Sequence, residues 1–170
     1  MIVPLQKDAA LLADIAAASN DADTLHVWWL GQSGFLLQQD GRRFLFDPYL
    51  SDSLTQKYAA TDKPHVRMTE RCIAPEMLTG IQWVTATHAH TDHLDGETLR
   101  GLAVGSPGYT LVLPGLAVNQ AVERLGDAQA TWMELNQADA SFSGGIQIHG
   151  VPAAHNEIVV DDYDRSQCVG

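Results

Sequence analysis

Three of the seven histidines fall within one short stretch, Ala86-Thr87-His88-Ala89-His90-Thr91-Asp92-His93-Leu94-Asp95. Imidazole and carboxylate groups are ligands that divalent metals of borderline hardness prefer. Residues 81–86 before the histidines are β-branched, aromatic or small and predict a buried strand, and residues 96–102 after them predict a short helix. The stretch therefore lies on a strand-to-helix turn, where α/β sheets place their sites.

The spacing of these side chains indicates how they could share metals. On an extended backbone His88, His90 and Asp92 point to the same side, because side chains alternate with period two. His93 points away from them unless the loop curls. A curled loop offers His88 and His90 to one metal, and Asp92 and His93 to a second. A helix would separate His88 from His90, and the remaining alternative is a solvated polar loop rich in histidine.

The segment Thr87–His93 resembles the signature loop of the metallo-β-lactamase fold superfamily. That superfamily contains hydrolases of lactones, thioesters, β-lactams and phosphodiesters, together with a few oxygenases and oxidoreductases. Three further segments strengthen the resemblance to the branch that includes ascorbate-6-phosphate lactonase, a branch of metal-dependent hydrolases. They are Trp28-Trp29-Leu30-Gly31-Gln32-Ser33-Gly34, Leu45-Phe46-Asp47-Pro48-Tyr49-Leu50 and Val151-Pro152-Ala153-Ala154-His155.

The resemblance implies an α/β fold, an αββα sandwich of two mixed sheets between helices with metals at one edge. It also implies that residues 1–170 form one domain covering the first half of that fold and the start of the second. The family pattern continues to a bridging aspartate after a strand and to a last histidine, and neither can be placed here. Asp161, Asp162 and Asp164 come too early, in an acidic loop. We therefore expect the carboxy-terminal part of the fold to be missing, either because the chain is a piece of a longer protein or because it is a short product.

The resemblance further assigns roles to six residues. By it, His88, His90 and His155 bind one metal, while Asp92 and His93 bind a second with groups not found in this sequence. Asp92 also takes or shuttles a proton, as the catalytic residue. Asp47 matches a buried aspartate that orients the histidine loop, although Asp47 directly before a proline is also typical of a turn. Zinc is the expected metal, as one or two ions, with manganese and iron as alternatives.

The function implied is hydrolysis of a lactone or related ester by a metal-activated water. A phosphodiester hydrolase is the nearest alternative. An iron-dependent oxygenase acting on a thiol-linked substrate would use the same ligand motif. The third alternative is an inactive, truncated module that binds metal. Each enzymatic alternative implies a small-molecule substrate.

Composition limits the class of protein and its partners. A chain of 170 residues, 45% of them hydrophobic and 18% charged, is long enough to form one domain with a hydrophobic core. Its net charge of −11 opposes binding to nucleic acid and to anionic membranes. Lys7 is the only early cation, and Asp14 interrupts the apolar stretch at residues 9–18, so neither a signal peptide nor a membrane span is predicted. We expect a cytoplasmic protein with two reduced cysteines. A half-fold would expose a sheet face, which predicts self-association into a homo-oligomer.

Periodicity predicts the remaining elements. A helix is expected over residues 8–19, then strands over 24–30, 35–37 and 43–46, the last two joined at Asp40-Gly41 as a hairpin. Residues 69–78 predict a short helical segment. The succession of a strand over 109–113, a helix over 114–124 and a strand over 130–135 indicates parallel pairing. A further strand is expected over 146–151. The cations of residues 51–71 either bind an anionic substrate group or lie in a solvated loop. His26, His65 and His149 are not expected to bind metal.

Overall fold

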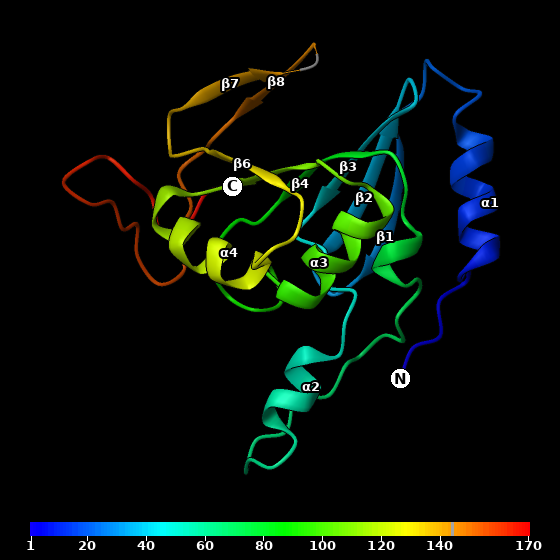
Figure 1. Cartoon of the computed structure of the whole chain (residues 1–170), viewed down its shortest axis with the longest axis horizontal. Helices are drawn as coiled ribbons and strands as arrows, with labels where there is room; N and C mark the ends of the chain where they lie inside the picture. Colours follow the sequence, from blue (N-terminus) through cyan, green and yellow to red (C-terminus); the bar gives the residue numbers. More distant parts are fainter. Residues whose placement is uncertain (144) are drawn as a thin grey trace.

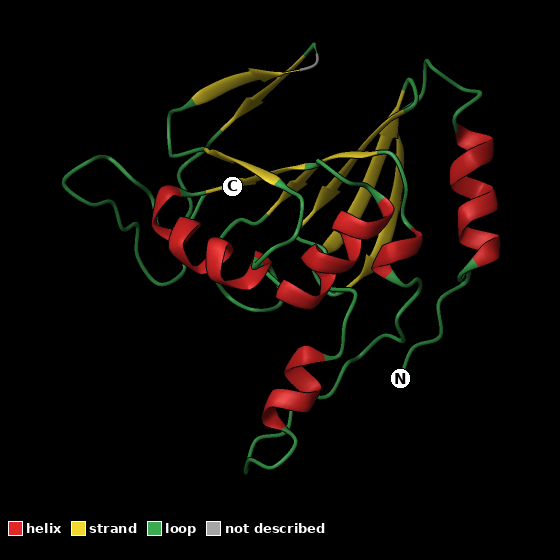
Figure 2. Ribbon diagram, in the orientation of Figure 1, coloured by secondary structure: helices red, strands yellow, loops and turns green. Residues whose placement is uncertain are grey.

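A computed structural model describes residues 1–143 and 145–170 of the chain (Figures 1 and 2). Its helices are α1 Ala9–Ala18, α2 Ser53–Tyr58, α3 Gly96–Gly105 and α4 Val118–Leu125, with 3₁₀ turns at Pro75–Met77 and Gly115–Ala117. Its strands are β1 His26–Gly31, β2 Gly34–Gln39, β3 Arg42–Phe46, β4 Ile81–Thr85, β5 Thr110–Leu113, β6 Thr131–Glu134, β7 Ala140–Ser143 and β8 Ile146–His149. The predicted α/β fold class is confirmed.

Six strands form one mixed sheet in the order β1-β2-β3-β4-β5-β6. The first three strands pair antiparallel, because the turns at Gln32–Ser33 and Asp40–Gly41 are too short for any other connection. The pairs β3–β4, β4–β5 and β5–β6 are parallel, and longer connections that contain helices join these strands. Both the antiparallel edge and the parallel pairing were predicted from the sequence and are confirmed. β7 and β8 form a separate hairpin (Figure 1).

The core lies on one face of the sheet. Along that face Leu36, Leu45, Val84 and Leu111 occupy paired positions of β2 to β5 and are fully buried. Apolar residues of the three longer helices pack in the same cluster: Leu11 and Ile15 of α1, Leu99 and Leu102 of α3, and Ala121 and Leu125 of α4. Burial of this alternating set of side chains fixes the register, because a slip by one residue would expose all of them.

The opposite face of the sheet carries exposed apolar side chains. Trp29, Phe35 and Phe46 are paired across β1, β2 and β3, and they keep 54%, 39% and 42% of their accessible area, with Val27 of β1 at 55%. The hairpin β7–β8 covers another part of this face, where the Ser141 hydroxyl contacts the sulfur of Met133 on β6. One layer of helices therefore covers only one side of the sheet near β1 to β3.

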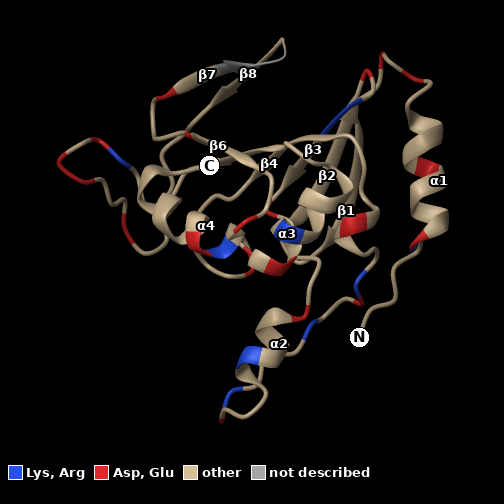
Figure 3. Ribbon diagram, in the orientation of Figure 1, with Lys and Arg blue, Asp and Glu red and all other residues tan. Residues whose placement is uncertain are grey.

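Three local predictions are corrected by the structure. Residues 51–71 contain the short helix α2, which projects from the body of the molecule (Figure 1), and residues 69–78 are helical only at Pro75–Met77. Arg67 is not solvated: it is 4% exposed and donates hydrogen bonds to the carbonyl oxygens of Tyr49 and Thr69. Strand β7 was not predicted, because Ala140–Ser143 is short and polar. Lys57 and Lys63 lie on α2 and the loop after it (Figure 3).

The end of α3 approaches the segment after α2 so closely that only glycine fits at residue 105. A Cβ atom there would lie 2.5 Å from the backbone oxygens of both Glu76 and Leu78. We predict that Gly105→Ala lowers the free energy of unfolding by about 1–3 kcal/mol, since backbone must move to admit the methyl group. Unfolding in urea measures this change in the free energy of unfolding. Val104→Ala, at a neighbouring side chain that is 75% exposed, is the control and should change stability by less than about 0.5 kcal/mol. Equal effects would contradict the close-packing argument.

Candidate metal centre

The histidine loop begins where β4 ends and finishes at the first turn of α3. Backbone hydrogen bonds fix its entry, because Ala86 N–H donates to Val112 O at 2.9 Å. The loop then curls: the amides of His93 and Leu94 both donate to His90 O, at 3.1 and 2.8 Å. Asp95 ends the loop as the N-cap of α3 and accepts a hydrogen bond from Thr98 N–H at 3.0 Å. The curled loop is the form that the spacing of its ligands required.

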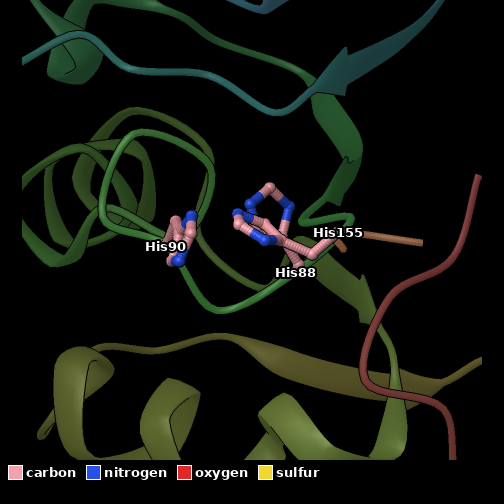
Figure 4. A group of neighbouring side chains, drawn as sticks. All are labelled: His88, His90 and His155. Carbon is pink, nitrogen blue, oxygen red and sulfur yellow. The ribbon is translucent and has the colours of Figure 1, made fainter. Parts of the chain in front are cut away.

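Three histidines converge at this loop. One nitrogen from each of His88, His90 and His155 lies within 4.8 Å of the other two, whereas the ligands of a tetrahedral zinc lie about 3.3 Å apart. The ring centroid of His90 lies 4.7 Å from that of His88 and 4.6 Å from that of His155. Figure 4 shows the three rings gathered around one region. Among the described residues, this is the one group of three or more side chains suited to hold a metal.

His155 reaches the loop through backbone pairing near the end of the chain. Val169 N–H donates to Thr87 O at 3.0 Å, and Val151 and Gly170 exchange two hydrogen bonds at 3.2 and 3.1 Å. These bonds tie the segment that carries His155 to Thr87, two residues after the end of β4. A residue far away in the sequence therefore joins His88 and His90, and backbone hydrogen bonds position it.

Asp47 is the polar centre of the loop's support. It follows β3 directly, is 5% exposed, and has a left-handed backbone with φ of 41°. Its carboxylate accepts hydrogen bonds from the Thr87 amide at 2.9 Å, the Thr87 and Thr85 hydroxyls, and His93 Nδ1 at 2.6 Å. Since His93 Nδ1–H donates to the Asp47 carboxylate, the Nε2 atom of that ring is free to face the site. Thr85 and Thr87 were not predicted as partners of Asp47, because no sequence motif marks the hydroxyl group of either threonine.

Asp92 and His93 lie beside the three-histidine group but outside it. His93 Nε2 is 3.7 Å from the Asp92 carboxylate, and the His93 ring centroid is 4.1 Å from that of His88. His26, His65 and His149 lie elsewhere: His26 is on β1 near Asp21, His65 contacts Thr55, and His149 ends β8. The structure thus brings together all five residues to which metal binding was assigned by resemblance.

The pKa shifts favour neutral imidazole at His88. Burial, followed by repulsion from His93 and His90, lowers the pKa of His88 to about 4. Burial also acts to lower the pKa of His93, but the hydrogen bond and charge of Asp47, with the charge of Asp92, raise it overall above its usual value. A neutral imidazole keeps the lone pair that a metal needs. Three convergent imidazoles, one of them held neutral, fit a divalent metal such as zinc in donor type and number.

A cavity of about 300 Å³ opens over the three histidines. Its remaining lining residues come from the loop and the carboxy-terminal segment: Ala89, Asn156, Glu157, Val159, Gln167 and Cys168. Cys168 and Cys72 are both free and buried. A larger cavity of about 510 Å³ lies between the amino-terminal residues and β1, and its lining is mostly apolar. The three histidines and most of the polar side chains around them line the smaller cavity.

Comparison with known proteins gives a consistent family. The sequence model of a β-lactamase superfamily domain matches residues 26–167. An uncharacterized Mycobacterium tuberculosis protein is 30% identical over 135 residues, which are 79% of this chain and 35% of that protein. A metal-dependent hydrolase of Aeropyrum pernix is 26% identical over 144 residues, covering 78% of this chain and 52% of the relative. The chain thus spans from about a third to about half of these relatives.

Solved structures share the fold. The diiron β-hydroxylase CmlA of Streptomyces venezuelae aligns with a TM-score of 0.54 and 20% identity, over 75% of this chain and 24% of that one. An isothiocyanate hydrolase from Delia radicum gut bacteria aligns with a TM-score of 0.53 and 20% identity, over 78% and 49%. Within the described residues, no helix has both the length and the apolar character needed to cross a membrane.

The Asp47–His93 pair gives a prediction for the metal-free protein. We expect the His93 pKa to lie above 6.5 and to fall in Asp47→Asn, because the partner charge is lost while asparagine tolerates the left-handed backbone. The raised pKa means that the pair stabilises the fold below about pH 6.5 and that this stabilisation disappears as pH rises through the folded pKa. NMR titration of the imidazole protons measures the shift. Asp92→Asn, the control, should lower the pKa less; an unchanged pKa in Asp47→Asn would refute the pairing.

Proposed function

The chain belongs to the β-lactamase superfamily, in its metallo-β-lactamase fold, and from this premise we propose that it is a metal-dependent hydrolase domain. The observation that carries the proposal is the convergence of His88, His90 and His155 at one end of the sheet. Relatives named as metal-dependent hydrolases support the same activity. Residues 1–170 would act as one domain, and the cytoplasmic location stays a prediction from the sequence.

Zinc is the metal we propose for the three-histidine group. Three imidazoles and one open position form a known type of catalytic zinc site. The bound metal would supply an activated water at neutral pH. Because an iron-dependent oxygenase would use the same ligand motif, as the diiron β-hydroxylase among the fold neighbours illustrates, the relatives named as metal-dependent hydrolases are what favours a hydrolase. Manganese and iron remain the alternative metals.

The chain's own residues would direct the reaction. Asp47 holds His93 through Nδ1 and keeps the loop in its curled form. Asp92 has a partly exposed carboxylate beside His93 Nε2, so we assign it the task of accepting the proton from the attacking water. Asp92 and His93 would also bind a second metal ion, together with ligands that are not among residues 1–170. We propose a small lactone or related ester as substrate, on resemblance, with phosphodiesters as the second class.

Metal analysis and a substrate panel test this function. We predict about one firmly bound zinc per 170-residue chain, because the described residues provide one group of three ligands. His155→Ala should lose that zinc, while His149→Ala, at a histidine on β8, should keep it. Lactones should be hydrolysed slowly and phosphodiesters less. Bound iron together with oxygen consumption, or no bound metal in the wild type, would overturn the proposal of a zinc hydrolase. Bound metal without hydrolysis of any ester would instead support the inactive metal-binding module.

The exposed apolar face of the sheet carries a second proposal, that the 170-residue chain forms a homo-oligomer. Trp29, Phe35 and Phe46 form a continuous row, and such patches favour association. We predict that light scattering gives a mass above that of the 18.5 kDa monomer. The double variant Trp29→Ser with Phe46→Ser should reduce that mass, and Val104→Ser on α3 should leave it unchanged. A monodisperse wild-type monomer would contradict self-association.

A further inference from the structure

Arg124 of α4 extends across to the histidine loop. Its Nη1 atom donates to the carbonyl oxygens of Ala89, at 2.8 Å, and Leu94, at 2.7 Å, and its side chain is half-buried. We propose that Arg124 is a positioning residue that holds this loop in the shape that binds metal. This inference rests on the proposed metal centre but concerns a residue outside the signature loop and outside its ligand set.

The two acceptor carbonyls enclose the part of the loop that turns. Ala89 separates His88 from His90, and Leu94 follows His93 directly. Within that turn, both the His93 and Leu94 amides converge on His90 O. A guanidinium that binds both ends therefore sets the distance between them, and its charge makes these hydrogen bonds stronger than bonds between neutral groups. Fixing the Ala89 carbonyl also fixes the peptide that joins the two metal-binding histidines.

Contacts of α4 with α3 hold Arg124 itself in place. Arg100 of α3 donates a hydrogen bond to Arg124 O. Gly96, the first residue of α3, lets the two helices meet closely, because a Cβ atom there would lie 3.0 Å from Arg124 O and 3.2 Å from Arg124 Cβ. The backbone of Arg124 is therefore anchored at the junction of α3 and α4, while its side chain extends to the loop. This arrangement couples the helix junction to the geometry of the ligands.

Zinc affinity and hydrogen exchange of the complete 170-residue chain test the proposal. We expect Arg124→Met to weaken zinc binding, measured by competition with a chromophoric chelator, about 10–100-fold, as for other residues that orient ligands. In the metal-free protein, the His93 and Leu94 amides should exchange faster. Arg124→Lys should lose less affinity, because one charged donor remains. Arg100→Met removes one anchor of the Arg124 backbone but leaves both loop contacts of the Arg124 side chain in place, so it should lose clearly less zinc affinity than Arg124→Met.

The outcomes separate this inference from the proposed function. If the wild-type chain binds no zinc, the proposed function fails, and the exchange rates of the metal-free variants alone decide whether Arg124 holds the loop. Wild-type zinc affinity or unchanged loop exchange in Arg124→Met would overturn the inference. Equal losses in Arg124→Met and Arg100→Met would also overturn it, by assigning the effect to helix packing. Should Arg124→Met fail to fold by circular dichroism, Arg124→Gln decides, because its shorter, neutral side chain loses the charged donor, and unchanged affinity and exchange there would reject the role.

Discussion

The buried carboxylate of Asp47 is the interaction on which the geometry of the site depends. A buried carboxylate is costly unless hydrogen-bond donors surround it, and here the donors come from the end of β4 and from the histidine loop. The parallel pairing of β3 with β4 makes this possible, because it places Asp47 beside Thr85, whose carbonyl accepts from the Asp47 amide. The sheet thus fixes the carboxylate, and the carboxylate fixes His93.

Backbone hydrogen bonds bring the other segments of the site together. Three segments meet at the end of β4: the loop itself, the residues after β3, and the carboxy-terminal residues that carry His155. Backbone hydrogen bonds such as Val169 N–H to Thr87 O join the last segment to the others. The three-histidine group is partly exposed, with His88 half-buried and His90 and His155 exposed. An exposed group of this kind leaves room for a substrate to approach.

Sequence reasoning reached the elements whose residues follow a regular pattern. The apolar strand at residues 81–86 and the helix after the loop carry strong periodic signals, and both are present as β4 and α3. No pattern in the neighbouring residues indicates that His155 lies near His88 and His90, so the family resemblance alone identified it. Arg124 and Arg67 were missed as structural donors, since their acceptors are backbone carbonyls elsewhere in the chain. Contacts of this type depend on the folded arrangement, which no pattern of neighbouring residues records. The ligand roles themselves stay predictions.

The left-handed backbone at Asp47 also has a consequence for laboratory evolution. A φ of 41° is a conformation that glycine adopts at no steric cost and that other residues adopt with strain. Glycine at this position would relieve that strain but would lose the hydrogen bonds of the carboxylate and release His93. Heat resistance alone does not report on metal binding, so selection at this site needs a metal-dependent readout alongside heat.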